Sequence, residues 1–416
     1  MGAPTQDVSP EEADEHLEEL ARLTDTAGAQ VVAVLIQRLD APHPRYFIGE
    51  GKASQLKRLA REREATVVIF DDELTPAQGK NLEDLLDLRV MDRTELILDI
   101  FATRARTNEA QLQVELAQLE YLLPRLKRMW THLSRIRGGI GLRGPGETQL
   151  ETDRRIIGRR ISDLRGKLQV VAQRRATQRK GRSGEFQAAL VGYTNAGKSS
   201  LLRKLSGSEL FIEDRLFATL DPATRQVELP MGATVLLTDT VGFIRKLPHD
   251  LVASFRATLE EASEAEVLLH VIDASHPRWE EQKQVVEEVL NELDLGEVPV
   301  ALVFNKVDQL THDEEHALRQ RARALIPEPA IFTSTVEEGG TQELLGLLEE
   351  RLRAQRPEVQ VLIPAADGES IATVYREGEV ISRTEHGTTI DLRARLPEIT
   401  LGRLRQRKGV QVNGAA

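Results

Sequence analysis

The stretch Gly192-Tyr193-Thr194-Asn195-Ala196-Gly197-Lys198-Ser199 decides the fold, because it is a complete G-x-x-x-x-G-K-S pattern. The apolar run Ala188 to Val191 precedes it and Ser200-Leu201-Leu202 follows it, so the pattern lies between a predicted strand and a predicted helix. In such a loop the backbone N–H groups point at a β-phosphate, and the helix N-terminus adds partial positive charge. We therefore predict that Gly192 to Ser200 bind the phosphates of a nucleotide.

Two residues of this loop and one later segment predict the chemistry. Lys198 would reach the β- and γ-phosphates, and the Ser199 hydroxyl would ligate Mg²⁺, a hard cation that prefers oxygen. Asp239-Thr240-Val241-Gly242 follows the apolar run Val235 to Thr238, which places a carboxylate where acids of this type hold the magnesium through water. The Gly242 N–H would contact the γ-phosphate.

A third segment predicts the base. Asn305-Lys306-Val307-Asp308 ends another apolar run, and an aspartate there can accept two hydrogen bonds from guanine, a donor pair that adenine lacks. A buried site of this kind rejects the wrong base by roughly four orders of magnitude. Phe332-Thr333-Ser334-Thr335 ends the next run and would supply a backbone N–H to the guanine oxygen. GTP is therefore the predicted nucleotide.

The order of apolar runs predicts an α/β multidomain fold with four parts. Strand-like runs alternate with helical segments in the central part, which is typical of a doubly wound, mostly parallel sheet. The first part contains the β-branched runs Val31 to Ile36 and Val67 to Phe70, so its sheet is expected to be partly parallel. The parts are an N-terminal α/β domain (1–107), a basic helical hairpin (108–180), a GTPase domain (181–355) and a C-terminal α+β domain (356–416).

The hairpin is predicted from two leucine-rich runs and the glycines between them. Apolar residues from Leu112 to Leu133 step by alternating four and three, and a second run extends from Leu150 to Val171. Residues 138–146 include five glycines and cannot continue either helix, so they form the tip. Pro124 is expected to kink the first helix.

This hairpin is a polycation within an acidic protein. The chain has a net charge of −11, but residues 121–182 contain 17 Lys and Arg against 4 Asp and Glu, which gives this segment +13 and the remainder −24. Such charge suits RNA phosphates, although it could also solvate an exposed coiled coil. The expected RNA-binding residues are Arg135, Arg137, Gly138, Gly139, Arg143, Gly144, Arg154 and Arg155.

Composition excludes several other classes of protein. There is no cysteine, so a disulfide framework, a thiolate zinc site and a cysteine nucleophile are all excluded. Gly139, Gly141 and Gly144 fit a dinucleotide-binding pattern, but no predicted strand precedes them. The start of the chain resembles no secretion signal, and no run is long enough to span a bilayer. We expect a cytoplasmic protein that is a monomer.

Several motifs together resemble the HflX family of translation-factor-related GTPases. They are Phe217-Ala218-Thr219-Leu220-Asp221-Pro222, Asp239-Thr240-Val241-Gly242-Phe243-Ile244, Gly138-Gly139-Ile140-Gly141, Arg143-Gly144-Pro145-Gly146-Glu147, Gly49-Glu50-Gly51-Lys52 and Thr26-Ala27-Gly28. The resemblance implies that the chain binds the large ribosomal subunit and its RNA and, as in some members, separates the subunits of stalled or stressed ribosomes. The hairpin tip would then reach toward the peptidyl transferase region.

The resemblance also assigns residues. It implies that Phe217 to Asp221 belong to the GTP site and that Thr219 is the switch threonine, which meets Mg²⁺ and senses the γ-phosphate; Thr224 competes for this role. Thr335 and Ala223 depart from the family pattern, which usually has alanine and threonine at those positions. The predicted catalytic set is Lys198, Thr219 and Gly242, and the predicted magnesium set is Ser199, Thr219 and Asp239.

Phe243 occupies the position at which signalling GTPases carry the glutamine that orients the attacking water. A phenyl ring cannot orient water by hydrogen bonding, so hydrolysis should be slow in the isolated protein and stimulated by ribosomal particles. Arg245 or His249 could replace the glutamine within the chain. Two other functions remain open: an NTP-driven RNA-remodelling enzyme, and a non-hydrolysing module whose RNA-binding shape GTP stabilises.

Overall fold

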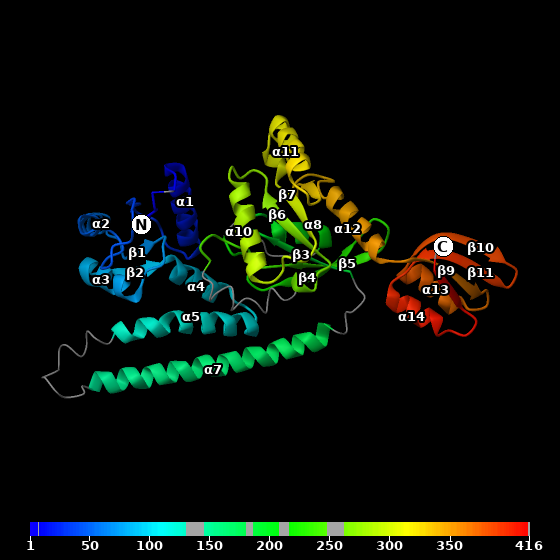
Figure 1. The fold of residues 1–416 in the computed structure, drawn as a ribbon, viewed down its shortest axis with the longest axis horizontal. Coiled ribbons are helices and arrows are strands. Elements are labelled where there is room, and N and C mark those ends of the chain that lie inside the picture. The colour runs from blue at the N-terminus through cyan, green and yellow to red at the C-terminus, as the bar shows by residue number, and fades with distance from the viewer. Residues whose placement is uncertain (7, 130–144, 180–185, 208–215, 248–261, 415–416) are drawn as a thin grey trace. The chain divides into compact units, whose positions relative to one another are not determined.

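The computed structural model describes residues 1–6, 8–129, 145–179, 186–207, 216–247 and 262–414 (Figure 1). By contacts the chain forms two compact units. Unit 1 consists of Met1–Arg175, Glu213–Asp221 and Val241–Thr258, and unit 2 consists of Ala176–Ile212, Pro222–Thr240 and Leu259–Ala416. The four sequence-based domain boundaries stay a prediction, because this division follows contacts rather than chain order.

Unit 1 begins with helices around a short parallel sheet. Helix α1 starts at a capping box, in which the Ser9 hydroxyl accepts from the Glu12 N–H and the Glu12 carboxylate accepts from the Ser9 N–H. Strands β1 and β2 pair in parallel, as expected. The elements are α1 (Pro10–Thr26), α2 (Glu50–Glu62), β1 (Val67–Phe70), α3 (Pro76–Leu86), β2 (Arg89–Asp92) and α4 (Arg93–Arg104).

The structure does not contain the strand that was expected at Val31 to Ile36. Only Ile36 makes a bridge, in parallel with Gly2, and Val31 to Leu35 adopt no regular structure. Three of these side chains remain exposed, with Val31 at 41%, Val32 at 48% and Val34 at 54% of their surface. A β-branched run becomes a strand only where a neighbouring strand accepts its hydrogen bonds.

The hairpin consists of α5 (Asn108–Met129) and α7 (Pro145–Arg179), which run side by side and antiparallel (Figure 1). Leu116, Ile161 and Leu164 form the buried centre of the seam between them. Arg160 and Arg165 form ion pairs with Glu115 and Glu120 of α5. The glycine-rich tip lies outside the described residues, and with it lie the RNA-contact predictions at Arg135, Arg137, Gly138, Gly139, Arg143 and Gly144.

Unit 2 contains a six-stranded sheet of order β4-β5-β3-β6-β7-β8, in which only β4 is antiparallel. The five expected strands are confirmed, and β4 was not expected because its sequence is largely polar and exposed. The elements are β3 (Gln187–Gly192), α8 (Lys198–Ser206), β4 (Ala223–Glu228), β5 (Thr234–Asp239), β6 (Val267–Asp273), α10 (Trp279–Glu292), β7 (Val300–Asn305), η2 (Val307–Gln309), α11 (His312–Leu325), β8 (Ala330–Thr333) and α12 (Gln342–Gln355).

A separate antiparallel sheet of order β10-β11-β9-β12 follows at the C-terminal end. It confirms the α+β class expected for this segment. Its core contains Val361, Ile363 and Leu392, which are all fully buried. The elements are β9 (Glu358–Pro364), α13 (Gly368–Glu377), β10 (Glu379–His386), β11 (Thr389–Arg395), α14 (Glu398–Arg405) and β12 (Gln411–Gly414).

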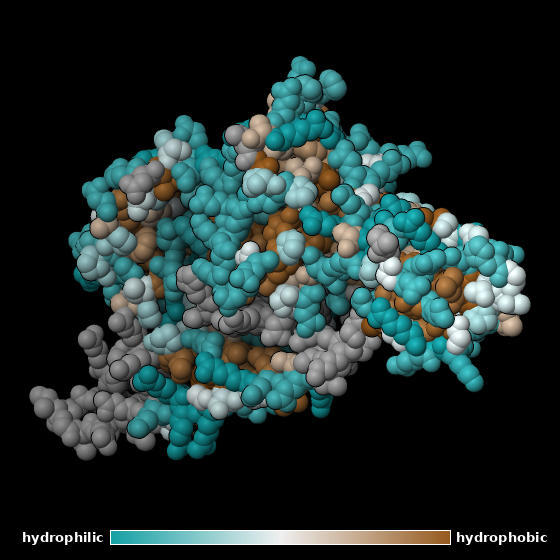
Figure 2. Space-filling model, turned by 45° about the vertical axis from the view of Figure 1, so that its right-hand side comes forward, coloured by the Kyte–Doolittle hydropathy of each residue, from teal (hydrophilic) through white to brown (hydrophobic). Residues whose placement is uncertain are grey.

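The face of the molecule drawn in Figure 2 is mainly hydrophilic. Polar and charged side chains cover most of it, and patches of hydrophobic side chains show between them. None of the helices in the described part of the chain combines the length and the apolar character needed to cross a bilayer.

The hairpin seam gives a first test. Replacing Leu164, which is fully buried, by alanine should lower the free energy of unfolding of the hairpin by about 2–5 kcal/mol, through lost burial and the cavity left behind. Hydrogen exchange of the α5 and α7 amides would measure this loss. Ile156→Ala is the matched control on α7, since Ile156 is 56% exposed and should change little. Equal exchange rates in the two variants would contradict the packing described.

Candidate GTP-binding site

The phosphate loop connects β3 to α8 through backbone conformations that few residues adopt. Gly197 has a φ of 98°, and a Cβ added there would lie 2.2 Å from the Nδ2 of Asn305. Gly192 also has a positive φ, and a Cβ there would lie 2.3 Å from the backbone oxygen of Val271. Only glycine fits both positions, so the pattern predicted from sequence is fixed by backbone geometry as well as by phosphate approach.

Lys198 begins α8 and points its amine into the loop. Its side chain is buried, and Nζ donates to the backbone oxygens of Gly192 at 3.0 Å and Tyr193 at 2.8 Å. Burial lowers the pKa of Lys198 from 10.5 to about 8, against the opposing effect of the Asp239 carboxylate. The amine is therefore held beside the loop, where phosphate oxygens would compete with the two carbonyls for its protons.

Two of the three residues proposed for magnesium, Ser199 and Asp239, form a pair of oxygen ligands. Ser199 Oγ donates to Asp239 Oδ2 at 2.5 Å, and Asp239 is 1% exposed at the end of β5. Thr240, the next residue, donates its hydroxyl to the backbone oxygen of Leu190 at 2.7 Å, which ties β5 to β3. Hydroxyl and carboxylate oxygens are ligands that suit Mg²⁺, so the donor set fits this cation.

No cluster of three or more His, Cys, Asp or Glu side chains able to hold a metal occurs within the described residues. A magnesium ion bound with a nucleotide does not require such a cluster, because it keeps several waters and shares the phosphate oxygens. Ser199 would ligate the ion and Asp239 would hold one of its waters. The ion would neutralise charge that develops on the phosphates during hydrolysis.

The base-binding residues come together at the ends of β7 and β8. Asn305 is fully buried, donates through Nδ2 to the backbone oxygen of Ala196 at 2.9 Å, and accepts from the Thr333 hydroxyl at 3.2 Å. The Ser334 hydroxyl donates to Asp308 Oδ1 at 2.6 Å. The structure thus brings the Asn305–Asp308 and Thr333–Thr335 segments into one cluster and joins it to the phosphate loop.

Asp273 is a site residue that sequence reasoning missed. It ends β6 and accepts from Lys306 Nζ at 2.6 Å, and the Ser275 hydroxyl donates to its other oxygen at 2.6 Å. This ion pair holds the Lys306 side chain of the base-binding segment. Its position at the carboxyl end of a central strand, in Val-Ile-Asp-Ala-Ser, was the available signal.

The predicted switch segment Phe217 to Asp221 packs with the N-terminal elements of unit 1. Phe217 and Phe101 of α4 are each 1% exposed and meet edge to face with centroids 4.7 Å apart. The Asp221 carboxylate accepts from the backbone N–H groups of Arg106 at 3.0 Å and Thr107 at 3.3 Å, and from the Thr107 hydroxyl. Thr107 is the residue that caps α5, because its hydroxyl accepts from the Ala110 N–H, so Asp221 holds the capping residue in place.

The second predicted switch segment, from Val241 onward, is also anchored in unit 1. Lys246 Nζ lies 2.9 Å from Asp71 Oδ2 and 2.5 Å from Asp72 Oδ1, and Arg245 lies 3.5 Å from Glu19 of α1. Burial acts to raise the pKa of Asp71, but Arg93 and Lys246 outweigh it and the pKa lies below its usual value. The anchoring carboxylate is therefore ionised at neutral pH.

Phe243 and the two candidate switch threonines are placed as follows. Gly242 is buried, and Phe243 is 2% exposed, so its ring is part of the packed interior rather than a water-binding surface. The hydroxyl of Thr224, the competitor of Thr219, lies 2.9 Å from the Thr238 hydroxyl across β4 and β5. This contact joins the two strands, and the assignment of Thr219 as the switch threonine stays a prediction. His249 lies outside the described residues.

Three family models match consecutive parts of the chain. "GTP-binding GTPase N-terminal" matches residues 14–102, "GTP-binding GTPase Middle Region" matches residues 104–182, and "50S ribosome-binding GTPase" matches residues 187–306. The third match contains the phosphate loop, Asp239 and Asn305.

Curated relatives align over most of the chain. The GTPase HflX of Escherichia coli (strain K12) is 43% identical over 396 residues, which cover 94% of this chain and 92% of that protein. The GTPase HflX of Flavobacterium psychrophilum is 49% identical over 312 residues, 75% of each chain. A solved structure of a Sulfolobus solfataricus GTP-binding protein with GDP covers 85% of this chain and 98% of that one, at 26% identity and a TM-score of 0.44.

The lowered pKa of Lys198 predicts how nucleotide affinity depends on pH. Above its pKa of about 8 the free protein holds a neutral amine, whereas the phosphates favour the cation, so binding must take up a proton. The Kd for GDP should be nearly constant from about pH 6.5 to 7.5 and rise above pH 8, by at most tenfold per pH unit. Calorimetric titration would measure it. In Lys198→Met the Kd should be high throughout and the rise should be absent; the same rise in this variant would contradict the assignment.

Asp308 gives a test of base selection. In Asp308→Asn an amide N–H₂ replaces one acceptor oxygen, so one guanine donor loses its partner and GTP affinity should fall by about three to four orders of magnitude. Asp313→Asn, on the exposed first turn of α11, is the matched control and should bind GTP normally. Unchanged GTP affinity in Asp308→Asn would rule out its contact with the base.

Proposed function

The chain belongs to the HflX family of GTPases, which hydrolyse GTP, and we propose that it uses the GTP cycle to control its association with the large ribosomal subunit. The observation that carries this proposal is that both predicted switch segments are bonded to N-terminal elements of the same unit as the basic hairpin. A nucleotide acts only through the contacts that differ between its two states. Here the switch segments would make those contacts, and they are bonded within the same unit that contains the hairpin proposed to bind RNA.

The switch contacts suggest how the signal is passed. We assign Thr219 and Gly242 to the γ-phosphate, so GTP would draw both segments toward the nucleotide and hydrolysis would release them. Lys246 and Asp221 hold these segments against Asp71, Asp72 and Thr107. Movement of either segment would therefore break or remake ion pairs and the hydrogen bonds to Thr107, the residue that caps α5.

The hairpin supplies the surface for RNA. Arg154 and Arg155 of α7 are exposed, so their guanidinium groups are available to phosphates. Each such contact gains affinity by releasing counterions, which makes binding strongly dependent on salt. We propose that Arg154 and Arg155, together with the predicted tip residues, contact ribosomal RNA.

Hydrolysis would be slow without the ribosome. The buried Phe243 cannot orient water, and Arg245 lies beside Glu19, a neighbour that competes for its guanidinium. We propose that Mg²⁺ at Ser199, Asp239 and Thr219 assists the reaction and that the large subunit supplies the missing orientation. The protein would work as a monomer in the cytoplasm, where it separates the subunits of stalled or stressed ribosomes.

The test is GTP turnover by the purified protein, alone and with large ribosomal subunits. Subunits should raise turnover severalfold, and Lys198→Ala should stay inactive, because the phosphates lose their cation. If subunits do not raise the turnover of the intact protein but RNA alone does, the result favours an RNA-remodelling enzyme. If neither subunits nor RNA raise turnover, the result favours a passive GTP-stabilised module.

A charge-reversed variant tests the hairpin in the same assay. Arg154→Glu with Arg155→Glu should leave basal turnover unchanged and abolish most of the stimulation at physiological salt. The matched control is Arg405→Glu with Lys408→Glu, which changes the charge equally at exposed residues of the C-terminal part. If the two double variants are stimulated equally, the hairpin is not the RNA-binding surface.

A further inference from the structure

The first two residues of the chain lie inside a parallel sheet. The Met1 ammonium donates to the Ile69 backbone oxygen at 2.7 Å, and the Asp71 N–H donates to the Met1 oxygen at 3.0 Å. On the other side, the Gly2 N–H donates to Leu35, and the Gln37 N–H donates to Gly2, both at 3.0 Å. These alternating bonds are those of parallel strands, so Met1 and Gly2 lie between β1 and the segment that ends at Gln37.

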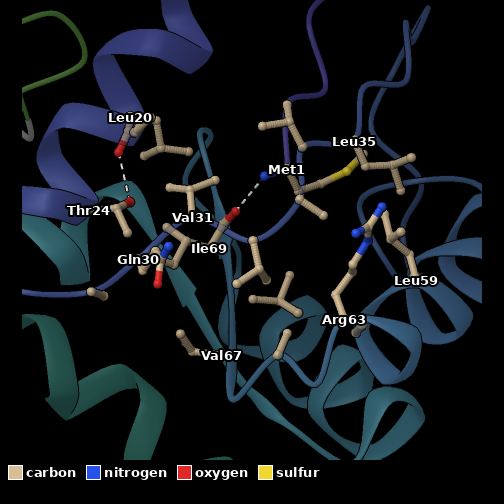
Figure 3. Close-up of a pocket in the computed structure, with 18 of the residues that line it drawn as sticks. Met1, Leu20, Thr24, Gln30, Val31, Leu35, Leu59, Arg63, Val67 and Ile69 are labelled. Carbon is tan, nitrogen blue, oxygen red and sulfur yellow. Dashed lines mark hydrogen bonds between the residues drawn. The ribbon is translucent and has the colours of Figure 1, made fainter.

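A pocket opens where this short strand stops. Figure 3 shows the Met1 nitrogen directed at Ile69, with Val31 and Val67 beside the space beyond it. Leu20 and Thr24 of α1 lie on one flank, and Leu59 of α2 and Arg63, which follows α2, lie on another. The residues lining it are almost all apolar. The pocket therefore continues the line of Met1 and Gly2, between two chain segments and two helices.

The two segments beside this pocket have free strand edges. Val31 to Val34 make no backbone hydrogen bond within the described residues, although three of the four are valines. On its pocket side β1 bonds only to Met1, through Ile69, while its other side pairs with β2. Backbone donors and acceptors next to apolar side chains are costly unless they are paired. Both edges fit a strand placed between them.

The charge at Met1 does not suit its surroundings. Burial lowers the pKa of the Met1 ammonium from 8.0 to about 6, although Asp71 and Asp72 favour its charged form. A peptide N–H at the same point would donate the same hydrogen bond to Ile69 without a buried charge. The position is thus better suited to a residue inside a chain than to the first residue of one.

We propose that this pocket is the place of a β-strand formed by residues that precede Met1 in the native chain. Continuing the observed register, the residue before Met1 would pair with Val34 and Ile69, the third with Val67, and the fourth with Val31. The strand would be apolar at every position, because helices cover a parallel sheet on both faces. It would turn Val31 to Ile36 into the strand that their composition predicts.

The geometry favours a covalent continuation over a separate occupant. A peptide from another protein would have to end at the Met1 ammonium, because Met1 and Gly2 already occupy the next positions of the strand. A small apolar molecule would leave the backbone groups of Val31 to Val34 and of β1 unpaired. Residues joined to Met1 satisfy both edges and remove the terminal charge.

Two measurements test the proposal together. Mass spectrometry of the protein isolated from its native source should find an N-terminus at least three residues before Met1. In parallel, the recombinant chain is extended before Met1 by Val-Leu-Ile-Val or, as the matched control, by Gly-Ser-Gly-Ser. Hydrogen exchange of the Ala33 and Leu35 amides, whose N–H groups face the added strand, should slow more than tenfold in the first chain and stay unchanged in the second.

Both results are required. A native chain that starts at Met1 or Gly2 overturns the proposal, as does equal exchange at Ala33 and Leu35 in the two extended chains. Protection by both extensions would also overturn it, since a polar, flexible segment lacks the apolar side chains that the pocket selects. GTP turnover is independent of this outcome, so the proposed function is not at risk in the same experiment.

Discussion

The nucleotide site depends on the hydrogen bonds of the Asn305 side chain. This side chain is fully buried; its amide nitrogen donates to the backbone of Ala196 in the phosphate loop, and its amide oxygen accepts from Thr333 at the end of β8. A buried amide of this kind is costly to leave unpaired, so the loops that would bind phosphate and base hold one another in place. Gly197 must be a glycine for the same reason, since any Cβ would occupy the space of the amide.

The two switch segments are held differently. They are fixed by an aromatic pair, by ion pairs at Lys246 and by the carboxylate of Asp221, all of them with N-terminal elements. Lys246 and Asp72 are both partly exposed, and an ion pair of this kind contributes only about 0–1 kcal/mol. Asp71 and Phe217 are buried, so their contacts are the firmer anchors. The site thus combines a rigid frame with switch segments that are held by buried contacts and by weaker exposed ones.

The sequence predicted the central sheet well because its strands are continuous apolar runs that end at polar motifs, as β3, β5 and β7 do. It failed at β4, whose residues are mostly polar and whose edge position demands little burial. It placed a strand at Val31 to Ile36 from composition, but a strand also needs partners, which composition does not report. Asp273 was missed because its role lies in a contact with Lys306 that is distant in the chain.

The bonds between Asp221 and Thr107, the residue that caps α5, have a consequence for genetics. A substitution at Asp221 would disturb the switch segment and, at the same time, remove the hydrogen bonds that hold Arg106 and Thr107 at the start of the helix. Loss of a cap costs about 0.5–2 kcal/mol. Alleles at this position should therefore be pleiotropic, combining reduced protein abundance with altered signalling. A second-site suppressor that restores the first turn of α5 would separate the two phenotypes.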